Sequence, residues 1–317
     1  MTTISNDWRM IPLAEAIADF LAEHAAEGTQ THRSYVAALG QLADFVAESS
    51  KIKSPTLEQL TRGRVEAFVE KLFSDGKMPA TVAHRIDVFK SASKWFAIRY
   101  PGYLDQLKSL RRPTIVNAGK RAFKPGDVDK LRSVIRAHAV AFLAARNALI
   151  FELAMRAGLR CSEICWLRAN NISDNMLVNV RRKGRKFFTL PMHSRIEEAL
   201  AAYLPLREAM LRAQAGRELS EEEAAKAPLL LRYVLQPCEI SHLEAKTVRR
   251  LFADAGKKVG LKKCHPHMAK HSFTNDVLRN ADLPTASRAA GHSNLSTTMA
   301  YLGRDLEDLE AAIKNLD

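Results

Sequence analysis

The stretch "AFLAARNALIFELAMRAG" at residues 141–158, followed by "LRCSEICWL" at 159–167, sets the architecture of the second half of the chain. Its apolar residues recur at helical spacing up to Gly158, and glycine commonly ends a helix because it accepts a positive φ. A second helix is expected next, because Ser162 and Glu163 suit a first helical turn. Arg160 falls between the two helices. The stretch therefore predicts two consecutive helices with a cation at their junction.

The segments around this junction are also mostly helical in pattern. "KPGDVDKLRSVI" (124–135) predicts a helix, as do 192–226 and several segments within 241–317. "MLVNVRRKGRKFFTLPM" (176–192) differs, because two short β-like runs flank a turn at Lys183 and Gly184. A mostly helical region with a small antiparallel sheet is therefore expected.

The first hundred residues predict a separate helical module. Apolar residues recur at helical spacing over 12–49, with a break near "EGTQT" where Thr29 or Thr31 can cap the second helix. "SPTLEQLTRGRVEAFVEKLF" (54–73) and "MPATVAHRIDVFKSASKWFAIRYPG" (78–102) predict two more helices.

The stretch "LKSLRRPTIVNAGKRAFKPGD" (107–127) combines two prolines, two glycines and several cations without clear periodicity. A domain boundary is expected near Asn117, which gives one domain at 1–117 and another at 118–317.

Charge points to a polyanionic partner, with nucleic acid the leading candidate. The 317 residues carry a net charge of +13, of which residues 1–117 contribute +2 and residues 118–317 contribute +11. No stretch is long and apolar enough for a membrane helix, and the first 20 residues lack the apolar run of a signal peptide. The expected location is the cytoplasm, in association with the nucleoid. Cys161 and Cys165 could share a metal, but they are expected to be small core residues.

Histidines and a tyrosine mark two further stretches. "HPHMAKHSF" (265–273) places His267, Lys270 and His271 on one helical turn, and "AAGHSNLSTTMAYL" (289–302) contains His292 and Tyr301. The two histidines four residues apart could form a zinc pair. A zinc hydrolase would need a glutamate after the first histidine, where this chain has Met268. That interpretation is therefore disfavoured.

Four of these stretches, in this order, resemble the motifs of the tyrosine recombinase (phage integrase) family, with Xer-type and phage-type integrases as nearest relatives. "GLRCSEICWL" resembles G-L-R-x-S-E-L, and "KGRKFFTLP" resembles K-G-x-K-x-R-x-x-P. "HMAKHSF" resembles H-x-L-R-H-T/S-F, and "GHSNLSTTMAYL" resembles G-H-x-x-x-x-T-T-x-x-Y. The resemblance implies a mainly α fold, with an all-helical, SAM-like core-binding domain that clamps DNA at 1–117. It implies a DNA breaking-rejoining catalytic domain at 118–317.

The implied activity is site-specific recombination of DNA. Attack on an anionic phosphodiester gathers charge on its nonbridging oxygens, and cationic side chains can stabilise that charge without a metal. The resemblance implies that Tyr301 is the nucleophile and forms a 3'-phosphotyrosyl bond. Arg160 would grip the scissile phosphate with Glu163 in support, and Lys183 would protonate the 5' oxygen. No metal, ATP or other cofactor is expected.

The same resemblance implies roles for the histidines. His267 would contact the phosphate or act as a base, and His292 would donate a hydrogen bond to a nonbridging oxygen. His265 and His271 are expected to be structural or supporting residues.

Lys270 stands where the family has its second arginine. An ammonium keeps the charge but loses the bidentate fork that suits a phosphate. The loss of one charge-assisted hydrogen bond costs about ten- to hundredfold in rate. A slower or differently regulated recombinase is therefore expected, in which Lys270→Arg changes the rates of cleavage and joining.

Two other interpretations remain open. The chain could be a catalytically weak or silent DNA-binding relative that acts as a regulator or partner subunit, or a type IB topoisomerase with similar chemistry. The expected partners are double-stranded DNA recombination sites, bound as a homotetramer on two sites or a hetero-tetramer with a related recombinase. No membrane or small-molecule substrate is expected. "GRDLEDLEAAIKNLD" (303–317) could form a helix that docks on a neighbouring protomer or packs on its own domain.

Overall fold

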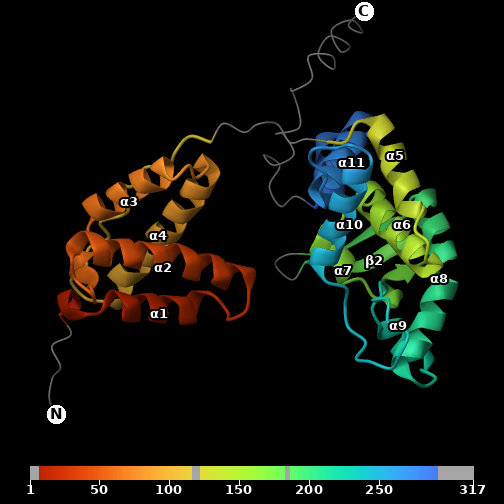
Figure 1. Ribbon diagram of the computed structural model, residues 1–317, viewed down its shortest axis with the longest axis horizontal. Coiled ribbons are helices and arrows are strands. Elements are labelled where there is room, and N and C mark those ends of the chain that lie inside the picture. The colour runs from red at the N-terminus through yellow and green to blue at the C-terminus, as the bar shows by residue number, and fades with distance from the viewer. Residues whose placement is uncertain (1–6, 116–121, 183–185, 292–317) are drawn as a thin grey trace, which may run out of the picture. The chain divides into compact units, whose positions relative to one another are not determined.

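The computed structural model describes residues 7–115, 122–182 and 186–291 (Figure 1). The chain divides into two compact units, Met1–Asn117 and Ala118–Asp317.

The described part of the N-terminal unit is helical. Its α-helices are α1 (Leu13–His24), α2 (Gln30–Ser50), α3 (Arg62–Ser74) and α4 (Pro79–Arg99), with short 3-10 turns at Trp8–Met10 and Leu57–Gln59. Aromatic and aliphatic residues from all four helices form one core, in which Phe20, Phe89 and Phe96 are fully buried. This core accounts for the helical spacing of apolar residues in the sequence.

Hydrogen bonds at the helix ends decide where the helices begin. Of the two predicted caps, Thr29 is the one used, because its hydroxyl accepts a hydrogen bond from the His32 amide at 3.1 Å, whereas Thr31 lies inside α2. The prediction of a continuous helix from residue 54 was wrong. The Gln59 side chain accepts from the Thr56 amide at 2.7 Å and holds a separate 3-10 turn, so α3 begins only after its own cap, Thr61.

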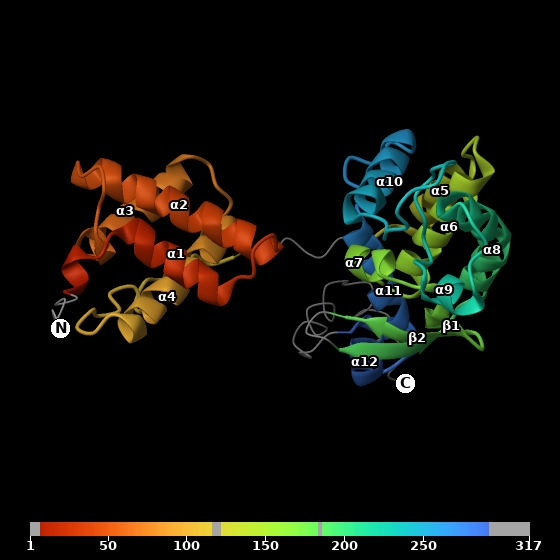
Figure 2. The same cartoon turned by 90° about the horizontal axis from the view of Figure 1, so that it is seen from below.

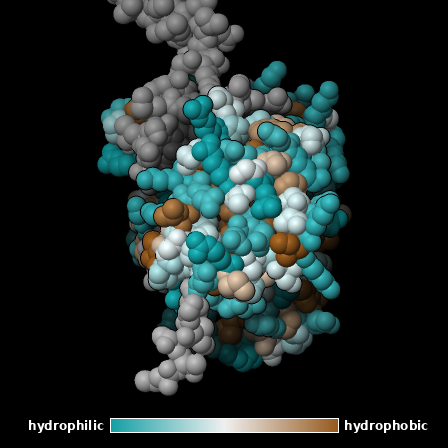
Figure 3. All heavy atoms as spheres, turned by 90° about the vertical axis from the view of Figure 1, so that its left-hand side faces the viewer, coloured by the Kyte–Doolittle hydropathy of each residue, from teal (hydrophilic) through white to brown (hydrophobic). Residues whose placement is uncertain are grey.

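One face of this unit is seen in Figure 3. Hydrophilic side chains predominate there, and the hydrophobic ones are scattered. Single exposed apolar residues of this kind are ordinary on protein surfaces.

The C-terminal unit is built around one buried helix. Its described helices are α5 (Pro125–Arg136), α6 (Ala141–Arg156), α7 (Cys161–Cys165), α8 (Ser194–Ala215), α9 (Glu221–Lys226), α10 (Ala245–Lys258), α11 (Pro266–Asn280) and α12 (Leu283–Ala290). Every residue of α6 from Ala148 to Met155 is buried, as in a helix surrounded by protein. α6 packs against α5, α8 and α11.

A small antiparallel sheet lies in the same unit (Figure 2). β1 (Ile172–Ser173) pairs with β2 (Met176–Arg181), which pairs with β3 (Phe187–Pro191). The predicted hairpin and the predicted fold class, mainly α with a small antiparallel sheet, are confirmed. No helix among the described residues is long and apolar enough to cross a membrane.

Candidate active site

The junction between α6 and α7 is fixed by close packing on α11. Gly158 has φ +58°, and a Cβ atom at this position would lie 2.3 Å from the ring of Phe273. Only glycine fits here, because a side chain would be strained by the backbone and blocked by the ring. The chain therefore turns directly from α6 to Arg160 against the surface of α11.

Arg160 and Glu163 form a local unit at the start of α7. The Arg160 amide donates to Glu163 Oε2 at 2.9 Å, and Arg160 Nη1 donates to Glu163 Oε1 at 2.7 Å. Glu163 is 3% exposed, whereas the Arg160 side chain is 38% exposed. One carboxylate thus holds both the backbone and the guanidinium of Arg160, while the side chain remains partly exposed.

Lys270 lies inside the protein. It is 1% exposed, and its Nζ donates hydrogen bonds to the carbonyl oxygens of Gly158 at 2.8 Å and Ala290 at 2.7 Å. The structure differs here from the expectation that Lys270 faces a phosphate as the family arginine would. Its shorter side chain ends where two main-chain carbonyls converge, and the ammonium is shared between them.

Arg182 is a cation of this site that the sequence did not single out. It follows β2, its guanidinium lies 3.3 Å from the centroid of the Phe188 ring, and it donates to the carbonyl oxygens of Arg288 at 3.4 Å and Ala289 at 3.1 Å. A Cβ atom on Gly291, which has φ +64°, would lie 1.7 Å from Arg182 Nη1. Its place in the basic run "RRKGRK" gave no signal that set it apart from its neighbours.

These residues form a cluster with excess positive charge. Burial, followed by the nearby charge of Arg160, lowers the pKa of Lys270 to about 7, and Arg182 lowers it further while Glu163 opposes the shift. Burial likewise lowers the pKa of Arg182 to about 10, with Glu163 opposing and Arg160 adding to the shift. We call Arg160, Arg182, Lys270 and Glu163 the cation cluster. Three cations around one carboxylate favour the binding of an anion.

The lowered pKa of Lys270 makes a prediction about stability. Between pH 7 and the ordinary lysine pKa of 10.5, the unfolded chain holds a proton that the folded chain has released. Stability therefore rises with pH in this window. The free energy of unfolding is measured in urea for the wild type and for Lys270→Met. We expect the wild-type value minus the variant value to increase between about pH 6.5 and about pH 9.5. Lys257→Met is the control, because Lys257 is exposed: the difference in unfolding free energy between the wild type and this variant should not change with pH. If the difference between the wild type and Lys270→Met is also constant with pH, the lowered pKa of Lys270 is contradicted.

The histidines of α11 lie beside Lys270. His267 is exposed, His271 is buried, and their ring centroids are 4.3 Å apart in an edge-to-face arrangement. His265 is the residue before the first turn of α11 and makes no capping side-chain hydrogen bond; burial, followed by the charge of Lys263, lowers its pKa. Among the described residues, no group of three His, Cys, Asp or Glu side chains could hold a metal ion.

The cysteines of α7 are free thiols. Burial raises the pKa of Cys165 to about 12 and also raises that of Cys161. Both therefore stay neutral at ordinary pH and serve as small packing residues.

Lys183, His292 and Tyr301 lie outside the described residues. The residues that immediately precede the first two, Arg182 and Gly291, are in direct contact. The structure thus brings together the described neighbours of two predicted site residues that are far apart in the sequence.

A basic surface adjoins the junction. The exposed cations of α10 and the following loop are Lys246, Arg249, Arg250, Lys257, Lys258, Lys262 and Lys263. α10 packs against α7, the helix that begins after Arg160, and the two lie side by side in Figure 2. Among the described residues, Glu244 pairs with Lys246 and Asp254 with Arg250, which leaves most of these cations without a carboxylate partner in that part of the chain.

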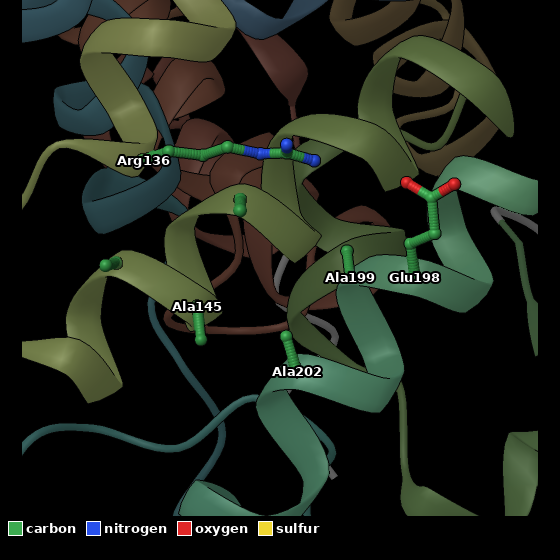
Figure 4. Close-up of a pocket in the computed structure, with 7 residues that line it drawn as sticks. Arg136, Ala145, Glu198, Ala199 and Ala202 are labelled. Atoms are coloured by element: carbon green, nitrogen blue, oxygen red, sulfur yellow. The ribbon is translucent and has the colours of Figure 1, made fainter.

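A pocket in the same unit is formed by other elements (Figure 4). Arg136 of α5 and Glu198 of α8 line it, and Ala145 of α6 faces Ala202 of α8 across it. It lies along the first half of α6, whereas Arg160 follows the other end of that helix. No residue of the cation cluster lines it.

Comparison with known proteins identifies the relatives of this chain. A model of the phage integrase family matches residues 125–307. The chain is 28% identical to tyrosine recombinase XerC of Thermodesulfovibrio yellowstonii over 287 residues, which cover 89% of this chain and 88% of that protein. It is 30% identical to tyrosine recombinase XerA of Thermococcus onnurineus over 220 residues, or 68% and 69% of the two chains.

Solved structures share the fold. XerH site-specific recombinase bound to palindromic difH substrate matches with a TM-score of 0.69 and 18% identity, covering 90% of this chain and 79% of that one. The Tn1549 transposon integrase in complex with circular intermediate DNA matches with a TM-score of 0.66 and 16% identity, covering 97% and 100%. The family model and the XerC and XerA relatives identify a tyrosine-type site-specific recombinase. The chain belongs to the phage integrase family, as the sequence motifs predicted.

Proposed function

We propose that this enzyme cuts and rejoins double-stranded DNA at specific sites through a 3'-phosphotyrosyl intermediate, without metal or ATP. The observation that carries the proposal is the cation cluster, in which Arg160 pairs with Glu163 and the charges of Arg182 and Lys270 act on the same group of described residues. An uncompensated positive site at a helix start suits a phosphodiester whose nonbridging oxygens gain charge during attack.

In the first step, the phenol oxygen of Tyr301 attacks the scissile phosphorus and forms the phosphotyrosyl bond. The bond from phosphorus to the 5' oxygen breaks, and Lys183 gives that oxygen a proton. Arg160 holds two phosphate oxygens through its exposed guanidinium, and Glu163 positions it. The phosphoester energy stays in the covalent link, so no nucleotide is consumed.

The histidines act on the same phosphate. His267, exposed on α11, contacts it or accepts the tyrosine proton, and His292 donates a hydrogen bond to a nonbridging oxygen. Below its pKa of about 7, Lys270 adds positive charge to the cluster from within the protein. In the second step, a 5' hydroxyl from the partner strand attacks the phosphotyrosine, restores a phosphodiester and releases Tyr301.

Recombination between two sites requires several protomers. We infer a homotetramer on two DNA sites, or a hetero-tetramer with a related recombinase, in which residues 1–117 clamp the DNA and 118–317 cut it. The solved lambda integrase dimer bound to a core site, which shares this fold with a TM-score of 0.66 and 16% identity, supports DNA as the partner. The basic surface of α10 supports it as well, because cations that neutralise phosphates supply most nonspecific DNA affinity.

A nicked suicide substrate tests the proposal. Cleavage near the nick lets a short fragment diffuse away, so the covalent intermediate cannot be reversed. The wild type is expected to give a protein-DNA adduct that survives denaturation, and Tyr301→Phe should give none while it still binds the DNA.

A DNA-binding relative that has lost its chemistry is the second candidate, and the withdrawal of Lys270 from the surface favours it. Under this alternative the wild type binds the same DNA site but forms no covalent protein-DNA adduct. Long incubation in buffer without EDTA, or with added metal, does not change this result. An adduct formed in EDTA would rule it out and would also support metal-independent cleavage.

A further inference from the structure

Three carbonyl oxygens at the end of α12 are held by two cations. Lys270 donates to Ala290 O at 2.7 Å, and Arg182 donates to Arg288 O at 3.4 Å and Ala289 O at 3.1 Å. The carboxyl end of a helix carries partial negative charge, so cations there are stabilising. α12 spans only Leu283–Ala290, and such a short helix depends on its ends for stability.

Each of these cations also reaches a second segment. Lys270 donates to Gly158 O, two residues before Arg160. Arg182 stacks on Phe188 of β3, and its amide donates to Lys186 O at 2.7 Å, which joins the two sides of the hairpin beyond β2. The end of α12 is therefore connected to the Arg160 junction by one cation and to the hairpin by the other.

We propose that Lys270 and Arg182 are positioning residues that together cap α12 and hold its end, the Gly158–Arg160 junction and the β2–β3 hairpin in one arrangement. This inference rests on the proposed function, because the three connected segments lead to Arg160, Lys183 and His292. Lys270 thus acts through other residues instead of gripping the phosphate itself.

The geometry explains why lysine suits position 270. Its ammonium directs tetrahedral donors at two carbonyl oxygens that both lie within 2.8 Å of it, inside a fully buried space. Arginine would bring a larger planar group into that space and push against the junction or α12. We therefore expect Lys270→Arg to lower the rate of cleavage. This is opposite to the gain expected if Lys270 were a shortened phosphate ligand.

Hydrogen-deuterium exchange in the DNA-free protein tests the connections directly. Lys270→Met is expected to speed exchange at least tenfold in peptides covering both 158–163 and 286–291. Arg182→Met should do so only in the peptide covering 286–291, because the hydrogen bonds described for its guanidinium go to Arg288 and Ala289. Arg181→Met is the matched control, since its exposed side chain lies over Trp166 and should leave both peptides unchanged. Unchanged exchange in Lys270→Met would overturn the proposal.

Cleavage of a substrate with a neutral methylphosphonate at the scissile position separates positioning from phosphate binding. A variant that lacks a cation facing the phosphate should recover its cleavage rate on this substrate, because the phosphate charge that the missing cation would have neutralised is absent. Lys270→Met is expected to cleave normal DNA at least tenfold more slowly at unchanged DNA affinity, and the neutral substrate should not restore its rate. Restoration would overturn the proposal. If the wild type formed no adduct, the proposed function would fail, whereas the exchange experiment would still decide on the connections.

Discussion

Replacing Arg160 with alanine is expected to slow cleavage of the nicked substrate by about 10²- to 10³-fold, the usual effect of removing one preorganised donor from a developing anion. Its side chain is 38% exposed and its guanidinium is anchored by Glu163 at 2.7 Å, so it can hold a phosphate without reorganising. The measurement is the single-turnover rate of adduct formation at saturating protein.

A substrate with a neutral scissile phosphate shows whether Arg160 acts by stabilising phosphate charge. Arg160→Ala should lose much less activity on the methylphosphonate substrate than on normal DNA, because less charge needs stabilisation. Arg212→Ala is the control, since Arg212 is exposed on α8 and pairs only at 3.7 Å with Glu218. A loss of less than about tenfold for Arg160→Ala would show that another group grips the phosphate.

Replacing Gly158 with alanine is expected to destabilise the C-terminal unit strongly. A positive φ costs a residue with a Cβ about 1–2 kcal/mol, and forcing an atom into packed surroundings costs about 1–3 kcal/mol more. Here the new Cβ would meet the Phe273 ring at 2.3 Å. The measurement is the free energy of unfolding in urea.

Gly260 offers a matched control in the same unit. Its φ is +76°, but no atom lies within 4 Å of the Cβ position, so Gly260→Ala should show the backbone cost alone. Combining Gly158→Ala with Phe273→Leu should recover part of the packing cost. Equal losses for the two glycine variants would contradict the account of the junction.

Local patterns predict much of the fold. The spacing of apolar residues predicts α4 and α6, and the β-like runs around Lys183 predict β2 and β3. The pairing of Arg160 with Glu163 is also local, since the two residues lie on one helical turn. The start of α3 was missed because a hydrogen bond between Thr56 and Gln59 competes with helix formation there.

The order of amino acids alone predicts the family, the helices and the hairpin, and the residues that carry positive charge. This is possible because sequence motifs and apolar periodicity depend on residues that are near neighbours in the chain. The roles of Lys270 and Arg182 emerge only in the folded protein. Lys270 meets a carbonyl 112 residues away, and Arg182 meets carbonyls 106 and 107 residues away. A buried ammonium binds whichever acceptors the packed chain brings within reach, and that choice follows from the folded arrangement of distant segments.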